Sequence, residues 1–194
     1  MAHLSRKGEW FIVAFLLLTF SFLAVQQAQH ISAVFEEPVI IATGYYKLKT
    51  GDFSLDATHP ALNYQLAAIP LLFVDIPFAF DNTDCAAGNF WQCTHTFFTA
   101  VDASGVNIDT LFFLARLPHI LIGVLLGIVL YTWTKQLYNR KTALLGITLY
   151  SLSPLFISFS GLATQPIVLS FFMVLSAFSF WHFTKNPRFI TLFL

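Results

Sequence analysis

The sequence predicts an all-α, polytopic membrane protein with about four transmembrane helices and short juxtamembrane helices in a large first outside loop. Hydrophobic residues make up 57% of the 194 residues and charged residues only 10%, whereas a soluble domain carries roughly 25% charged residues. The mean hydropathy is +0.71. Four apolar runs are each near the roughly 17–25 residues that a helix needs to span a bilayer. They cover residues 10–25, 111–133, 143–159 and 167–183.

The basic residues predict how these spans are oriented. Seven of the ten Lys and Arg residues form three clusters at alternating ends of the apolar runs, and the positive-inside rule places such clusters in the cytoplasm. We therefore expect a plasma (inner) membrane protein with a cytoplasmic N-terminus and an outside loop over residues 26–109, which holds nine of the ten acidic residues. No basic run is long enough to predict nucleic-acid binding. The clusters are Arg6 and Lys7, then Lys135, Arg140 and Lys141, then Lys185 and Arg188.

Both ends of the chain leave alternatives open. The first apolar run follows two basic residues, as in a signal peptide, but the residues after Val25 (QQAQH) offer a poor cleavage site, so a retained anchor is expected. The chain stops at Leu194 just as a fifth apolar run (FITLFL) begins. We therefore expect residues 1–194 to be the N-terminal part of a longer transmembrane domain.

The outside loop opens with Glu36-Glu37-Pro38, which predicts a helix start. Proline is favoured at the first helical position, where its missing N–H costs nothing, and Gly51 suits the C-terminal cap. The apolar residues of this helix are expected to lie along the membrane surface. A carboxylate at a helix N-terminus is stabilised in its ionised form by the helix dipole. The two acids are therefore either capping residues or a base with its partner.

His59-Pro60 precedes a second apolar helix in the same loop, over ALNYQLAAIPLLF. The imidazole of His59 can bond to a carboxylate, a phosphate or a metal, or it serves only as a surface cap. Glu36, Glu37 and His59 are together compatible with one divalent cation, although their spacing carries no specific metal signature. The sequence identifies no cofactor with certainty and leaves a divalent-cation site open.

Two polar residues lie near the outer ends of later spans. Arg116 lies a turn or two inside the second span, where it either snorkels to lipid headgroups or clamps a lipid-linked phosphate. Gln165 precedes Pro166 in a short outside turn. This pattern is typical of a helix start with Thr164 as the N-cap, and a lone glutamine there is more often structural than catalytic.

The two cysteines of the chain, Cys85 and Cys93, both lie in the outside loop. In an oxidising compartment they can form a disulfide that closes a small loop. The alternative is two free thiols. In either case we expect a structural role only.

These motifs, in this order, resemble the N-terminal part of a GT-C-type membrane glycosyltransferase. The nearest match is the phospholipid-carrier-dependent group that contains protein O-mannosyltransferases and the lipid A aminoarabinose transferase. In that group an acidic pair follows the first span, and a His-Pro step precedes an apolar helix. The resemblance covers nearly the whole chain. The matching residues are Glu36-Glu37-Pro38, Gly44-Tyr45, Gly51-Asp52-Phe53, His59-Pro60, Ile69-Pro70, Ala115-Arg116-Leu117, Tyr138-Asn139-Arg140-Lys141, Ser153-Pro154 and Thr164-Gln165-Pro166.

The resemblance implies a glycosyltransferase that moves a hexosyl or pentosyl group from a polyprenyl-phosphate donor to an outside protein, lipid or glycan, with inversion. Glu36 would act as the general base on the acceptor nucleophile, and Glu37 would orient the acceptor or support Glu36. Arg116, with His59, would steady the charge of the leaving phosphate. The residues that the resemblance assigns to substrate binding are His59, Arg116, Tyr45 and Gln165.

Two residues depart from the family pattern. Glu36 stands where aspartate is typical, which lengthens the reach of the carboxylate by one methylene. Gln165 stands where an aspartate usually precedes the second proline, which removes a charge. An inactive relative, or a non-enzymatic membrane scaffold that binds a partner, is therefore the alternative to an enzyme. The plain apolar centres of the spans argue against a transporter. The sugar, the acceptor and the carrier lipid are left open.

Overall fold

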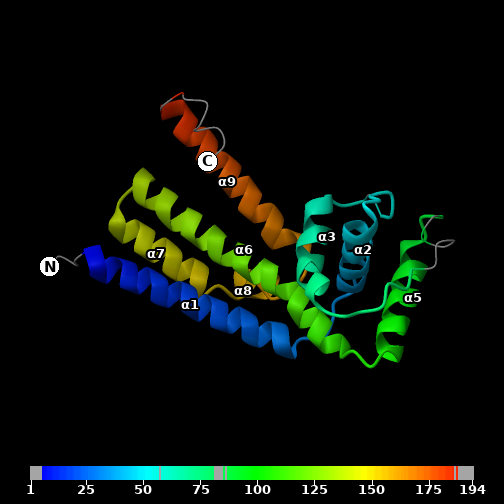
Figure 1. Cartoon of the computed structure of the whole chain (residues 1–194). Helices are drawn as coiled ribbons and strands as arrows, with labels where there is room; N and C mark the ends of the chain where they lie inside the picture. Colours follow the sequence, from blue (N-terminus) through cyan, green and yellow to red (C-terminus); the bar gives the residue numbers. More distant parts are fainter. Residues whose placement is uncertain (1–5, 57, 81–84, 86, 186, 188–194) are drawn as a thin grey trace. The chain divides into compact units, whose positions relative to one another are not determined.

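The computed structural model describes residues 6–56, 58–80, 85, 87–185 and 187. These residues form eight α-helices and one 3₁₀ helix, without a strand, which confirms the predicted all-α class (Figure 1). Asp81, Asp84, Arg188 and the apolar run 189–194 lie outside the described residues. The elements are α1 (Arg6–His30), α2 (Glu37–Thr50), α3 (Ala61–Ala68), η1 (Ile69–Phe73), α5 (Phe90–Ala103), α6 (Ile108–Leu137), α7 (Arg140–Ser151), α8 (Pro154–Ser160) and α9 (Gln165–Lys185).

The chain divides into two compact units. The first takes in the described parts of Met1–Gln26, Ile120–Ser160 and Pro166–Leu194, and the second takes in those of Gln27–His119 and Gly161–Gln165. Three described helices, α1, α6 and α9, are long and apolar enough to cross a membrane, and α7 with α8 makes up to a fourth span. The four predicted spans lie within these helices, as expected for an integral membrane protein.

The third predicted span is bent. α7 ends at Ser151, α8 begins at Pro154, and the two helices meet at 59°. Proline has no N–H to donate, and its ring disfavours helical backbone at the residue before it. Helical backbone is therefore disfavoured at Ser153, and the span predicted over residues 143–159 is divided into two short helices.

In the first unit, α1, α6 and α7 lie side by side because two glycines of α6 allow them to approach closely (Figure 1). A Cβ atom on Gly127 would lie 2.8 Å from Leu17 Cδ2 and 2.9 Å from Tyr150 Cε1. One turn earlier, a Cβ on Gly123 would lie 3.0 Å from the ring of Phe20. The Gly123 carbonyl also accepts a 2.6 Å hydrogen bond from the Tyr150 hydroxyl. Small residues and interhelical hydrogen bonds are what hold transmembrane helices together.

The substitution Gly127→Val is expected to destabilise the first unit by about 1–3 kcal/mol, the usual cost of overpacking a tight contact. Thermal unfolding in detergent measures this loss. Gly146→Val is the matched control, because a Cβ on Gly146 of α7 would meet its nearest neighbour, Thr134 Cγ2, only at 4.0 Å. Equal losses from the two substitutions would contradict the close packing at Gly127.

The first unit also holds a buried acid. Glu9 of α1 is 2% exposed and forms ion pairs with Lys135 at 2.5 Å and with Arg140 at 3.2 Å. The hydroxyl of Tyr131 donates to the same carboxylate. Part of the basic cluster between α6 and α7 is therefore neutralised by an acid from α1.

The second unit is built around α2, which packs against α3 and α5. Val39, Ile40 and Tyr46 are buried in its core, so they do not lie along a membrane surface as expected. A Cβ on Gly44 would lie 2.0 Å from the backbone oxygen of Tyr64, so α2 and α3 touch backbone to backbone at this position. α2 ends as predicted, because Gly51 adopts a left-handed φ of 71° and caps the helix.

The helix α5 was not expected from the sequence. Its N-cap is Asn89, whose side chain accepts a hydrogen bond from the backbone N–H of Gln92. Cys85 and Cys93 form a disulfide with a Cα–Cα distance of 5.4 Å, which resolves the two alternatives for these cysteines. The disulfide ties the first turn of α5 to the segment before it.

Candidate functional site

The two adjacent acids of the predicted site have opposite environments. Glu37 is the first residue of α2 and is fully buried, whereas Glu36 precedes the helix and is exposed. Successive residues at the start of a helix point in different directions and do not share a face. The sequence therefore places two carboxylates side by side in the chain, but only one of them faces the surface.

The Glu37 carboxylate is completely occupied by hydrogen bonds within the second unit. Its Oε1 atom accepts from Arg116 Nε at 2.9 Å and from the backbone N–H of Ala163 at 2.7 Å. Its Oε2 atom accepts from Arg116 Nη2 at 2.7 Å and from the N–H of Val34 at 3.1 Å. A two-pronged pair of this kind is among the strongest polar contacts in proteins.

Arg116 is 2% exposed and uses its other donors on the chain between α1 and α2. Its Nη1 atom donates to the carbonyls of Ala28 at 2.7 Å and Ile31 at 3.0 Å, and its Nη2 atom reaches the carbonyl of Ser32 at 3.4 Å. A guanidinium group has five N–H donors, and all five are engaged here. Binding a phosphate would require breaking some of these bonds.

Glu36 lines a pocket of about 140 Å³. His59, the other polar residue predicted for this site, is exposed and lines the same pocket. The structure thus brings Glu36, which directly precedes α2, and His59, which lies shortly before α3, to one cavity. The other residues that line this pocket are Phe35, Val39, Ile40, Asp56, Thr58, Tyr64, Phe90 and Trp91.

Asp56 also lines this pocket, although no motif in the sequence singles it out. It is 6% exposed and adopts a left-handed φ of 50°, a strained conformation that persists only when its surroundings enforce it. Its carboxylate accepts 2.6 Å and 3.1 Å hydrogen bonds from the Tyr64 hydroxyl and the Thr58 N–H. Its backbone carbonyl accepts from Lys47 Nζ at 2.8 Å, which also lies 4.2 Å from the centre of the Tyr64 ring.

The charges of this network are set by burial and hydrogen bonding. Burial acts to raise the pKa of Asp56, but hydrogen bonds from Thr58 and Tyr64 outweigh it and hold the pKa below its usual value. Burial lowers the pKa of Lys47. Burial and the bond to Asp56 together raise the pKa of the Tyr64 hydroxyl. Tyr64 therefore stays a hydrogen-bond donor to an ionised Asp56 at neutral pH.

The substitution Asp56→Asn is expected to cost about 2 kcal/mol of stability at neutral pH, because hydrogen bonds to a charged group contribute about 1.5–3 kcal/mol. Asparagine tolerates the left-handed backbone, so the loss reports on the charge. Because the folded-state pKa of Asp56 is depressed, its contribution is present above about pH 4 and is lost as the pH falls through the folded-state value. Denaturation measured over a range of pH should show the midpoints of Asp56→Asn and the unmodified protein converging in acid. A difference between the midpoints that does not change with pH would contradict the role of the Asp56 charge.

His119 is a further buried residue that the sequence reasoning missed. It is fully buried, with Nδ1 3.2 Å from the Ala115 carbonyl and Nε2 3.1 Å from Asn63 Oδ1. A neutral imidazole donates through one nitrogen only, so both contacts are satisfied when the Asn63 amide is turned to donate to Nε2. This contact links α3 to α6 inside the second unit.

Two residues assigned to substrate binding by resemblance lie away from the Glu36 pocket lining. Tyr45 is 2% exposed and packs among aromatic rings, with its centre 5.6 Å from that of Phe97. Gln165 is the half-buried first residue of α9. It follows by two residues the Ala163 N–H that bonds to Glu37. Glu37 therefore holds the turn that leads to Gln165.

The cation site of Glu36, Glu37 and His59 that the sequence leaves open has no counterpart among the described residues. Within the described part of the chain, no group of three or more His, Cys, Asp or Glu side chains is placed to hold a metal ion. Glu37 in particular has both oxygens committed to Arg116 and to backbone N–H groups.

Comparison with known sequences agrees with the resemblance. Residues 97–194 match the family described as dolichyl-phosphate-mannose-protein mannosyltransferase. The matched region is just over half of the chain and includes Arg116 and Gln165, whereas Glu36 and His59 precede it. No curated protein and no solved structure shows a significant match. The chain therefore belongs to the dolichyl-phosphate-mannose-protein mannosyltransferase family, and its membership implies an integral membrane glycosyltransferase that uses a lipid-linked sugar.

Proposed function

We propose that the chain transfers a sugar from a polyprenyl-phosphate donor to an acceptor outside the membrane, with inversion, and that Glu36 is the general base. The observation that carries this proposal is the division between the two acids. A base must come within hydrogen-bond distance of the proton that it removes. Glu36 is exposed and lines a pocket, whereas both oxygens of Glu37 are engaged inside the unit.

The proposed reaction is a single displacement. Glu36 accepts the proton of the acceptor hydroxyl as its oxygen forms a bond to the anomeric carbon of the sugar. The bond between that carbon and the phosphate oxygen breaks, and the polyprenyl phosphate leaves with the electron pair. His59 lines the same pocket, and in this proposal it donates a hydrogen bond to the phosphate as its charge develops.

Arg116 and Glu37 act in this proposal as positioning residues. Their ion pair joins the start of α2 to α6 and to residues 28–32, and Glu36 is the residue just before α2. Because the backbone after Glu36 is fixed, its carboxylate is already held at the pocket before the substrate binds. Little conformational entropy of Glu36 is then lost when the substrate binds. Asp56 does the same for the segment that carries His59. Tyr45 contributes by packing α2, and Gln165 by starting α9 in the turn bound to Glu37.

The proposed orientation places the pocket outside the cytoplasm. The support is the positive-inside rule applied to the three basic clusters, which puts residues 26–109 on the opposite side from the N-terminus. Cys85 and Cys93 form a disulfide in this segment, and disulfides persist in oxidising compartments outside the cytoplasm.

The test is a transfer assay with the full-length protein in membranes. Radiolabelled polyprenyl-phosphate mannose is supplied first, followed by other hexose and pentose donors. We expect labelled product whose anomeric configuration, read with linkage-specific glycosidases, is opposite to that of the donor. Product with retained configuration would contradict the single displacement. No transfer from any donor would favour an inactive relative or a membrane scaffold.

A further inference from the structure

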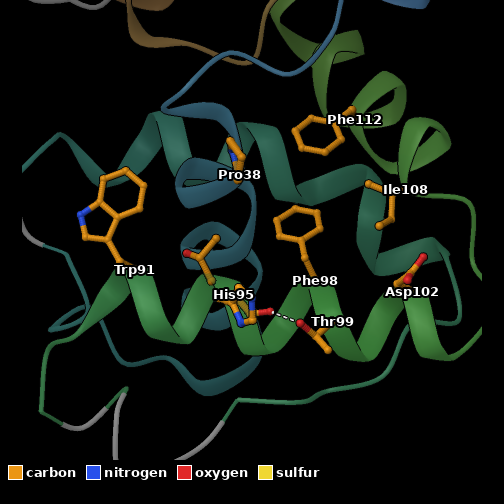
Figure 2. A pocket seen from close by; sticks show the side chains of 9 residues that line it. Pro38, Trp91, His95, Phe98, Thr99, Asp102, Ile108 and Phe112 are labelled. Carbon is orange, nitrogen blue, oxygen red and sulfur yellow. Dashed lines mark hydrogen bonds between the residues drawn. The ribbon is translucent and has the colours of Figure 1, made fainter.

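A second, larger cavity of about 680 Å³ lies beside the Glu36 pocket in the second unit. We call it the α5 groove. Figure 2 shows it running along α5, where Trp91, His95, Thr99 and Asp102 lie one after another on the helix. Its lining residues are Pro38, Trp91, Thr94, His95, Phe98, Thr99, Asp102, Ile108 and Phe112. None of these has a role in the proposed chemistry.

The α5 groove adjoins the candidate base. Trp91 lines both the groove and the Glu36 pocket, and Pro38, two residues after Glu36, forms part of its wall. A molecule seated in the groove that extends past Trp91 therefore reaches Glu36. This is the position that an acceptor must occupy if Glu36 removes its proton.

One lining residue points to a ligand that forms hydrogen bonds. Thr94 is 6% exposed, and its hydroxyl has no hydrogen-bond partner among the described residues. A buried hydroxyl without a partner is costly, and most buried polar groups in proteins are paired. A ligand in the groove that carries a hydrogen-bond acceptor, such as a carbonyl oxygen, would supply the missing partner of the Thr94 hydroxyl.

The charge around the groove favours a cationic ligand. Residues 27–119 contain nine acids and only three Lys or Arg residues. Two of those three, Arg116 and Lys47, are buried, so Lys49 is the exposed one among the described residues of this unit. Asp102 lines the groove and is exposed, and Asp109, which follows the groove residue Ile108 in the sequence, is exposed as well. The groove thus presents negative charge beside an aromatic surface.

We infer that the α5 groove binds a polypeptide segment of the acceptor and selects hydroxyl sites that are flanked by an apolar side chain and a basic residue. The apolar residue packs on Phe98, Phe112 and Trp91, the basic residue pairs with Asp102, and a peptide polar group bonds to Thr94. An isoprenoid chain offers nothing to Thr94, and its phosphate is repelled by Asp102. This inference rests on the proposed function, because it assigns the acceptor of that reaction.

The first experiment measures binding of fluorescent peptides to the full chain in neutral lipid nanodiscs, without a sugar donor. One peptide places a serine between phenylalanine and two lysines, and the other replaces the lysines with glutamates. We expect the lysine peptide to bind more tightly. The substitution Asp102→Lys should weaken it by about three- to tenfold and strengthen the glutamate peptide. Asp75→Lys, the same change at an exposed position outside the groove, should leave both affinities unchanged.

The second experiment separates binding from folding. Thr94→Val removes the unpartnered hydroxyl, so we expect it to raise the thermal midpoint while it weakens the lysine peptide by about fivefold, the value of one hydrogen bond. Thr43→Val is the matched control, because Thr43 also has a buried hydroxyl without a partner among the described residues, on α2 and outside the groove. It should raise the midpoint without changing peptide affinity.

Three results would overturn the inference. They are equal affinities for the two peptides, an unchanged affinity in Thr94→Val, and displacement of the lysine peptide by farnesyl phosphate that binds more tightly than the peptide. The last result would make the groove a site for the lipid carrier. Because no donor is present, the outcome does not depend on whether Glu36 is the base, and a failed transfer assay leaves this binding measurement intact.

Discussion

Glu37→Gln is expected to lower the free energy of unfolding of the second unit by about 3–5 kcal/mol. The substitution removes the countercharge of Arg116, whose side chain is 2% exposed, and an uncompensated buried charge has this cost. The glutamine side chain has one oxygen, which accepts hydrogen bonds, and one nitrogen, which only donates them. At least one N–H donor that is now paired with Glu37 therefore loses its partner. Denaturant unfolding of the purified protein in detergent measures the loss.

Arg116→Gln completes a double-mutant cycle for this ion pair. We expect Arg116→Gln to be severely destabilising as well, because it leaves the Glu37 carboxylate and the carbonyls of Ala28 and Ile31 without donors. The double variant should lose less stability than the sum of the two single losses, since neither charge is then left alone. Strictly additive losses would contradict the pairing of Glu37 with Arg116.

Glu36→Gln is expected to lower the rate of sugar transfer by about 10²–10⁴-fold, the usual contribution of a general base. Glutamine keeps the size of the side chain but has no carboxylate to accept a proton. Because Glu36 is exposed and makes no hydrogen bond through its side chain to cap α2, the free energy of unfolding should stay within about 0.5 kcal/mol of that of the unmodified protein. Initial rates of transfer from a labelled donor measure the effect.

Glu36→Asp is the matched control for this prediction. Aspartate keeps the carboxylate and shortens its reach by one methylene, so we expect a rate between those of the unmodified protein and Glu36→Gln. If glutamine and aspartate at position 36 give equally low rates with the same midpoints, the carboxylate acts by its placement rather than by accepting a proton. A rate unchanged in Glu36→Gln would remove Glu36 from the chemistry.

The helix boundaries of the outside loop follow from local sequence. The Glu36-Glu37-Pro38 step, Gly51 and Pro60 each act through the backbone of their own residues, by a missing N–H or a permitted left-handed φ. α2 accordingly begins at Glu37 and ends before Gly51, and α3 begins at Ala61. The four apolar runs are equally local, because the length and hydropathy of a single segment decide them.

The roles of the charged residues do not follow from local sequence. The partner of Arg116 is 79 residues away, and that of Glu9 is 126 residues away. No periodicity in the chain links such positions. Lys47 looks like a residue placed to interact with the C-terminal end of α2, but it is 2% exposed and bonds to the backbone of Asp56. Burial of this kind depends on how α2 and α3 pack, which a single sequence does not reveal.

The amphipathic α5 was missed for a different reason. Its first turn follows Gly88 and Asn89 and carries Cys93, so this stretch favours a short loop closed by a disulfide. The signal that was available is the Asn89 cap, whose side chain accepts from Gln92. The α5 groove depends on this helix and was therefore also absent from the sequence-based site.

We propose that two neighbouring acids have separate roles, Glu36 in the chemistry and Glu37 in the fold. The most direct test is the transfer rate per folded molecule for Glu36→Gln and Glu37→Gln, measured side by side in the same membranes. We expect Glu36→Gln to be folded and inactive, and Glu37→Gln to be poorly folded but active in the fraction that folds. A folded, inactive Glu37→Gln beside an active Glu36→Gln would contradict this proposal.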